Sequence, residues 1–155
     1  MTTTQPEPRP QTTAPGPQAK ALDDRIRTFL AEPNYATLAT LGEDGAPHQA
    51  VIWYRVDPDD RILANSRSPR RWPRELQRDG RAALAVIDRA DPMRWVGLQL
   101  VVEEVIDDVA RARDDIVALA VRYGGDDPET VAIYRTQARI TFRLRIVAVH
   151  EHLEE

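Results

Sequence analysis

The strand-like segments of this chain follow one another mostly through turns too short to hold a crossover helix. β-prone residues fill the runs 35–41, 46–56, 61–66, 81–88 and 94–106. The first two runs flank residues 42–45, a glycine-bounded acidic turn that indicates a β-hairpin. Parallel neighbours need a crossover of about a dozen residues or more, so these turns favour an antiparallel sheet.

The last run has the clearest alternation in the chain. One face carries Ile140, Phe142, Leu144, Ile146 and Ala148, and the other carries Arg139, Thr141, Arg143 and Arg145. A period of two places successive side chains on opposite faces of a strand. The pattern therefore predicts a half-buried strand that ends near His150.

Helical signals punctuate these strands. Apolar residues at helical spacing open the ordered part of the chain at Leu22 and stop before Pro33. Residues 73–80 have proline near the start and glycine just past the end of a short helix, and residues 107–123 form one long helix before a Gly-Gly stop. The sequence thus predicts a mainly β (α+β) fold, a six-stranded antiparallel barrel with two or three flanking helices.

The chain length and composition fit one folded domain. Residues 1–20 hold five of the twelve prolines and almost nothing apolar, which predicts a disordered tail before a domain over 21–155. Because the sequence has no cysteine, disulfides and thiol nucleophiles are excluded. No signal-like segment and no membrane-length apolar run is present, so we expect a cytoplasmic protein without a membrane partner.

The most unusual charge feature is the stretch from Arg67 to Arg81. It holds six arginines against Glu75 and Asp79, in a chain whose net charge is −4. A local basic site on an acidic chain favours a phosphorylated small molecule over nucleic acid. Ser68 is predicted to cap the short helix that follows, and free N–H groups at a helix start favour an anion. The alternative is a solvated surface turn.

The sequence offers no catalytic constellation of its own. It lacks a Gly-x-Ser-x-Gly motif, a P-loop and a Gly-x-Gly-x-x-Gly motif. His48, His150 and His152 have no metal-binding spacing, so we assign no metal and no catalytic side chain. This pattern is compatible with an enzyme whose cofactor carries the chemistry.

Five segments in this order resemble the FMN-binding split-barrel superfamily, the pyridoxine 5′-phosphate oxidase-like proteins. Within it they resemble the group that uses the deazaflavin coenzyme F-420 (8-hydroxy-5-deazaflavin). The matching segments are 36–47, 50–53, 65–84, 91–95 and 102–105. The resemblance implies a six-stranded split barrel, a homodimer, and a cofactor groove at the subunit interface.

The resemblance also implies which residues bind the cofactor. The ring system would lie beside Val51 and Trp53, and a partner subunit would contribute residues near Arg94 and Trp95. Trp72 stands where relatives commonly carry a lysine, a charge that Arg70 or Arg71 could replace. The phosphate would lie against Asn65, Ser66, Arg67, Ser68, Pro69, Arg70 and Arg71.

The implied function is an oxidoreductase that transfers a hydride between coenzyme F-420 and a small planar organic substrate. Two alternatives stay open on the same fold. One is an FMN-dependent oxidase or flavin reductase, and the other is a flavin- or deazaflavin-binding protein without catalysis. Nucleic-acid binding is not expected, because the basic stretch has no aromatic-studded basic sheet around it.

Overall fold

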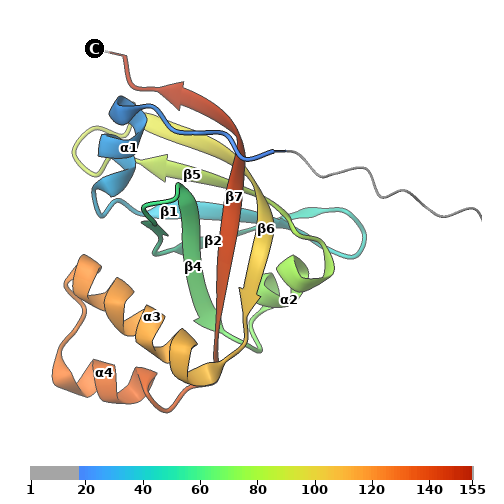
Figure 1. Cartoon of the computed structure of the whole chain (residues 1–155), viewed down its shortest axis with the longest axis vertical. Coiled ribbons are helices and arrows are strands. Elements are labelled where there is room, and N and C mark those ends of the chain that lie inside the picture. The colour runs from blue at the N-terminus through green and yellow to red at the C-terminus, as the bar shows by residue number, and fades with distance from the viewer. Residues whose placement is uncertain (1–17, 155) are drawn as a thin grey trace, which may run out of the picture.

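Residues 18–154 form one sheet of seven antiparallel strands, in the spatial order β2-β1-β5-β6-β7-β4-β3. The computed structural model describes these residues, so the predicted tail over 1–20 lies outside the described part apart from residues 18–20. Figure 1 shows β6 and β7 side by side along the length of the molecule. The strands are β1 (Ala36–Leu41), β2 (Pro47–Ile52), β3 (Arg55–Val56), β4 (Arg61–Arg67), β5 (Arg81–Ile87), β6 (Trp95–Ile106) and β7 (Arg139–His152).

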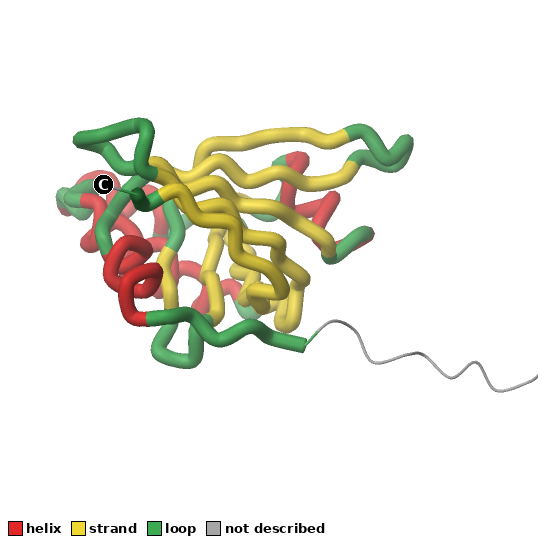
Figure 2. Tube along the Cα trace, turned by 90° about the horizontal axis from the view of Figure 1, so that it is seen from above, coloured by secondary structure: helices red, strands yellow, loops and turns green. Residues whose placement is uncertain are grey.

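The sheet curls into a half-barrel because one stretch of chain serves both of its edges. Strand β2 pairs with β1, whereas β3, which is separated from β2 by only two residues, pairs with β4 at the opposite edge. Figure 2 shows the resulting curvature, with strands bending around the interior. This architecture agrees with the split barrel that the resemblance implied.

The expected count of six strands was wrong, because the run 46–56 is broken at Trp53 and Tyr54. The backbone of Tyr54 has side-chain partners from a helix instead of a neighbouring strand. Its N–H donates to the Tyr123 hydroxyl at 3.4 Å, and its carbonyl accepts from Arg122 Nε at 3.0 Å. Because the backbone of Tyr54 is bonded to side chains of a helix, the strand pairing stops here. The chain leaves one edge of the sheet and joins the other.

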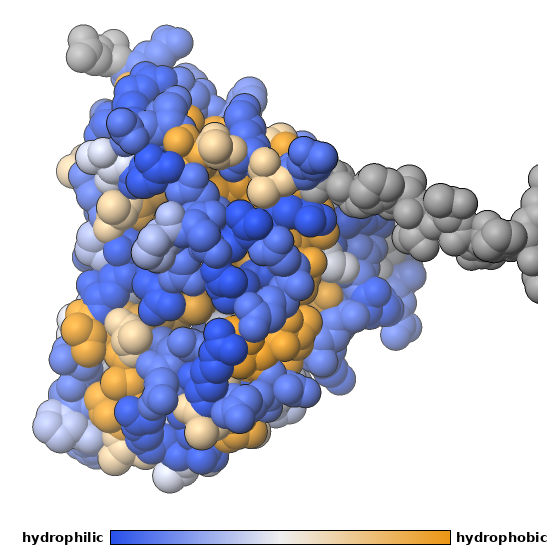
Figure 3. All heavy atoms as spheres, viewed as in Figure 1, coloured by the Kyte–Doolittle hydropathy of each residue, from blue (hydrophilic) through white to orange (hydrophobic). Residues whose placement is uncertain are grey.

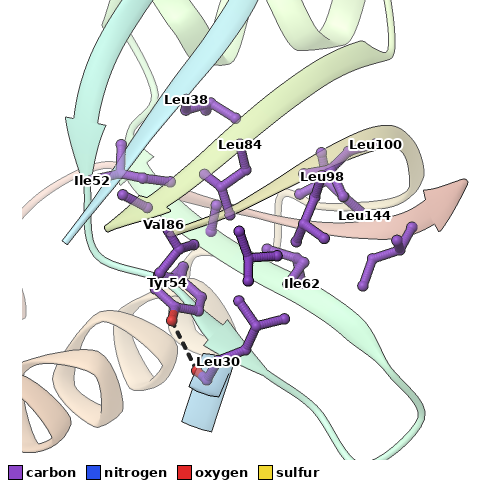
Figure 4. Close-up of a cluster of buried hydrophobic side chains, with 14 of the residues drawn as sticks. Leu30, Leu38, Ile52, Tyr54, Ile62, Leu84, Val86, Leu98, Leu100 and Leu144 are labelled. Atoms are coloured by element: carbon purple, nitrogen blue, oxygen red, sulfur yellow. Dashed lines mark hydrogen bonds between the residues drawn. The ribbon is translucent and has the colours of Figure 1, made fainter. Parts of the chain in front are cut away.

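The barrel interior is filled by apolar side chains from most of the strands. Figure 4 shows them around Tyr54, whose hydroxyl donates to the carbonyl of Leu30 at 2.8 Å. Full burial of one such aliphatic side chain contributes about 2 kcal/mol relative to exposure. The labelled members are Leu30, Leu38, Ile52, Tyr54, Ile62, Leu84, Val86, Leu98, Leu100 and Leu144, all at most 7% exposed.

Four helices flank the described sheet, one more than the two or three expected. They are α1 (Asp24–Ala31), α2 (Arg71–Arg78), α3 (Val109–Tyr123) and α4 (Pro128–Tyr134). The extra helix is α4, which has an Asp127 cap but no buried residue, so no apolar stripe marked it. None of the helices in residues 18–154 is long and apolar enough to cross a membrane.

Helix α3 covers the outer side of β4 and β7. Leu63 of β4 packs in a second small core with Ile116 and Leu119 of α3. For this reason Arg139 and Thr141, on the polar face of the expected half-buried strand, are only 7% and 0% exposed. Figure 3 shows that the molecular face is largely hydrophilic, with hydrophobic patches over α3 and α4.

Candidate functional site

A groove of about 650 Å³ runs between the free edge of β2, the end of β4 and the start of α2. Residues from α3, α4 and β7 close its far side. The split of the barrel creates this groove, since β2 and β4 are not paired to each other. Eight of the twelve predicted site residues line it, namely Val51, Trp53, Asn65, Ser66, Arg67, Arg70, Arg71 and Trp72.

One end of the groove is cationic and centred on Arg139, a residue that the sequence analysis did not assign to the site. Arg139 is 7% exposed and pairs in register with Arg67 across β4 and β7. Burial, with a smaller contribution from the positive charges of Arg70 and Arg67, lowers the pKa of Arg139 to about 10. Among residues 18–154 no carboxylate forms an ion pair with Arg139, so its charge has no protein counter-ion there.

One buried polar atom at this end, the Nε of Arg139, lacks a hydrogen-bond partner within the described part of the chain. The Oγ of Ser66, a residue only 2% exposed, also lacks one, but Ser66 pairs with Ile140 and points to the other face of β4. Buried polar atoms nearly always have a partner, and buried charges are nearly always compensated. An anion bound in the groove, such as a phosphate group, could accept hydrogen bonds from the guanidinium and compensate its charge.

The start of α2 contributes to the same end. Arg70 is the N-cap residue and makes no side-chain cap hydrogen bond, so the first N–H groups of the helix have no capping acceptor among the side chains of residues 18–154. The predicted cap by Ser68 is wrong. The N–H of Arg70 donates to the carbonyl of Arg67, which places Ser68 and Pro69 inside a turn ahead of the helix.

A buried carboxylate fixes α2 against the β1–β2 hairpin. Glu75 is 4% exposed and accepts hydrogen bonds from the hydroxyl of Thr40 and from Nε of Arg71. Burial favours the neutral acid, but these hydrogen bonds outweigh it and hold the pKa of Glu75 below its ordinary value. His48 Nδ1 lies 3.4 Å from Glu75 Oε2 at the groove wall. Arg71 is thus neutralised by Glu75, unlike Arg139.

The other end of the groove is aromatic. Trp53 stacks on Tyr123 with ring centroids 5.1 Å apart and planes 5° from parallel, and Tyr123 in turn stacks on Tyr35. Gly125 lies against the indole, because a Cβ there would come within 3.1 Å of Trp53 Cη2. Val51, on the free edge of β2, is 75% exposed. The groove therefore offers a rigid flat wall some way from its cationic end.

Trp72 is mainly a core residue. It is 5% exposed and packs against Phe142 at a centroid distance of 5.7 Å, although part of it reaches the groove. Its large ring fills the position where the resemblance suggested a lysine. The cations available at this end are therefore Arg67, Arg70 and Arg139.

Four predicted site residues lie outside the groove of a single chain. Ser68 and Pro69 lie in the turn before α2, and Arg94 pairs with Asp88. Trp95 borders a shallow hollow on the outer face of β1, β5, β6 and β7, which is lined mostly by small side chains. Gln49 lines both that hollow and the groove, so the two surfaces are continuous.

Comparison with known proteins is consistent with this architecture. The sequence model of the pyridoxamine 5′-phosphate oxidase family matches residues 22–152. No curated protein matches the chain. Among solved structures, one titled F420 reductase is 25% identical, with a TM-score of 0.71, and the match covers 80% of this chain and 94% of that one.

Two further structures share the fold at lower identity. A conserved hypothetical protein from Mycobacterium tuberculosis is 23% identical, with a TM-score of 0.69 and 86% of each chain covered. A heme storage protein from Vibrio cholerae is 18% identical, with a TM-score of 0.64, and the match covers 85% of this chain and 95% of that one. At these identities the likeness concerns the fold alone.

Proposed function

Since this chain belongs to the pyridoxamine 5′-phosphate oxidase family, in the FMN-binding split-barrel superfamily, we propose that it is an oxidoreductase that holds coenzyme F-420 in the groove. In this proposal the protein transfers a hydride between the deazaflavin and a small planar organic substrate. Relatives of this fold include proteins described as oxidases, as reductases and as heme storage proteins, so the site must carry the argument.

The single observation that carries the proposal is the buried guanidinium of Arg139, which no carboxylate of residues 18–154 neutralises. A cation held away from water without a counter-ion is costly, and a bound anion removes that cost. Arg67 and Arg70 add positive charge beside it. The groove thus fits a phosphate group at one end.

The same groove fits a ring system at its other end. The stack of Trp53 and Tyr123 gives a flat, immobile surface, and the free edge of β2 leaves backbone groups open beside Val51. A bound deazaflavin would supply hydride transfer as its own chemistry. The role of the protein residues is to orient the ring, hold the phosphate and limit access of water.

We further propose that two copies of the chain associate through the outer sheet face. That face carries small side chains, no helix of residues 18–154 covers it, and it continues into the groove at Gln49. A second copy seated there would supply the missing wall of an open groove. Trp95 borders this face, which supports its expected contribution from a partner, whereas Arg94 pairs with Asp88 and does not line the face.

A fluorescence titration of the apo protein with coenzyme F-420, run beside one with FMN, tests the cofactor. Saturable binding of the deazaflavin at micromolar or lower concentration, with weaker binding of FMN, is the expected result. Preference for FMN would assign the protein to the oxidase or flavin-reductase alternative. Tight binding of F-420 without turnover of any acceptor would support the non-catalytic carrier instead.

A further inference from the structure

A continuous chain of hydrogen bonds links α3 to Arg139 through β7 and β4. The hydroxyl of Thr141 donates to Asp115 Oδ2 at 2.8 Å. Asn65 Nδ2 donates to Thr141 Oγ1 at 2.8 Å. Arg139 Nη1 then donates to Asn65 Oδ1 at 3.3 Å. Thr141 is fully buried and Asn65 is 8% exposed, so water competes little for these groups.

The two ends of this chain fix the direction of every bond in it. The carboxylate of Asp115 can only accept, so the proton of the Thr141 hydroxyl turns toward Asp115 and leaves Oγ1 free to accept. Asn65 Nδ2 also donates to the backbone carbonyl of Ala112 at 2.8 Å, which again can only accept. Both amide hydrogens of Asn65 are thereby used, and its oxygen must face Arg139.

The partners of Arg139 orient its charge without neutralising it. Asn65 and Gln137 offer neutral amide oxygens, and the ring of Tyr134 lies 5.0 Å from the guanidinium carbon. A carboxylate in either place would pair with Arg139 and compete with an incoming anion. The arrangement is therefore suited to holding a guanidinium ready for an external anion.

We propose that Asp115 and Thr141 are positioning residues that hold Arg139, through Asn65, in the orientation that binds a phosphate group. The identity of the ligand rests on the proposed function, but the positioning can be tested with inorganic phosphate alone. Asn65 then acts on the phosphate indirectly, because it has no free N–H to donate to it. Nothing in the sequence pattern links these residues, which come from three separate elements.

The test compares Thr141→Val with Thr141→Ser. The valine variant keeps the shape of the side chain but removes the hydroxyl, whereas the serine variant keeps the hydroxyl. We expect Thr141→Val to weaken the binding of inorganic phosphate roughly tenfold and Thr141→Ser to stay within about twofold of wild type. The dissociation constant is measured by NMR titration, and the thermal midpoint without phosphate is measured in parallel.

A second pair of variants, at Asp115, tests the proposal if Thr141→Val does not fold. Asp115 is partly exposed on α3, so Asp115→Ala should fold, and Asp115→Asn keeps an oxygen that can accept from Thr141. Asp115→Ala should weaken phosphate binding several-fold and Asp115→Asn much less. A merely structural role would lower the thermal midpoint of Thr141→Val or Asp115→Ala and leave the phosphate dissociation constant unchanged, and that result overturns the proposal.

Arg139→Gln separates this inference from the proposed function. In the first case, wild type binds phosphate and Arg139→Gln does not, whereas Thr141→Val and Asp115→Ala bind phosphate as tightly as wild type. The positioning role is then wrong, and the assignment of the anion site stands. If Arg139→Gln and Thr141→Val both weaken phosphate binding but neither F-420 nor FMN binds wild type, the positioning role stands and the cofactor proposal fails. Unchanged phosphate binding in Arg139→Gln removes both.

Discussion

Arg67 and Arg139 lie directly opposite each other across the β4–β7 strand pair, with no carboxylate of the described chain paired to Arg139. Like charges facing each other in a sheet destabilise it. Three other arginines of β3, β4 and β7 have acidic partners: Arg55 has Asp57, Arg61 has Glu103, and Arg143 has Asp57 and Asp59. Arg145 of β7 forms no ion pair in residues 18–154, but Arg67 and Arg139 are the two arginines of these strands without an acidic partner there that line the groove.

Replacing Arg139 by methionine should separate stability from binding. Because the variant removes an uncompensated buried charge, its thermal midpoint without ligand should equal or exceed that of wild type. Phosphate at ten times its dissociation constant should add about 1.4 kcal/mol to the stability of wild type alone, which raises the midpoint of wild type relative to the variant. Thermal unfolding with and without phosphate measures both effects. Equal stabilisation of the two proteins by phosphate would contradict the assignment.

Arg70 and Arg71 should behave differently, although they are neighbours in sequence. Arg70→Ala should weaken phosphate binding several-fold and leave stability unchanged, since Arg70 is exposed and makes no ion pair in residues 18–154. Arg71→Ala should lower stability by about 1–2 kcal/mol, because it removes a hydrogen bond to the buried Glu75. Denaturant unfolding and phosphate titration of each single variant provide the comparison. Loss of stability in Arg70→Ala with none in Arg71→Ala would reverse these roles.

Glu75 should make stability depend on pH in the acidic range. Its pKa is lower in the folded state than in the unfolded chain, so ionised Glu75 stabilises the fold above the unfolded value near 4.5. That contribution is lost as the pH falls through the folded pKa. Glu75→Gln should therefore be about 2 kcal/mol less stable than wild type at pH 7, and this difference should shrink as the pH falls below 4.5. A stability difference that stays constant from pH 7 to pH 3 would show that ionisation of Glu75 does not matter.

Gly125→Ala should disturb the aromatic end of the groove without touching the phosphate end. The added Cβ would meet Trp53 Cη2 at 3.1 Å, so the indole must shift from its stack on Tyr123. We expect roughly tenfold weaker binding of F-420 and unchanged binding of inorganic phosphate. The phosphate titration is the internal control. Unchanged F-420 affinity would remove Trp53 from the ring site.

Much of the fold was predictable from the sequence because local signals are strong in it. The predicted opening helix, the long helix ended by Gly124 and the hairpin around residues 42–45 are all confirmed. The break at Trp53 and Tyr54 was not predictable, because the local pattern of β2 and β3 is continuous. It depends on Arg122 and Tyr123, which approach from a helix about seventy residues away.

The candidate site was only partly predictable for the same reason. The arginines from Arg67 to Arg71 are adjacent in sequence, so their cluster was visible as a charge pattern. In the sequence, Arg139 looks like any polar residue of an alternating strand. In the structure, the ring of Tyr134 from α4 lies over its guanidinium, and the pairing of β7 with β4 brings Arg67 beside it. Strand pairing between distant segments leaves no local signal. The sequence signal that could have identified Arg139 as a site residue is its position at the very start of an apolar strand.

The measurement that tests the central claim most directly is a titration of wild type, Arg139→Gln and Arg81→Gln with coenzyme F-420. Arg81 belongs to the same basic stretch but pairs with Asp79 and lies outside the groove, so it is the matched control. We predict that Arg139→Gln weakens F-420 binding at least tenfold, about 1.4 kcal/mol, while Arg81→Gln binds as wild type does. Equal affinity of all three proteins would contradict the claim that the buried guanidinium of Arg139 holds the cofactor phosphate.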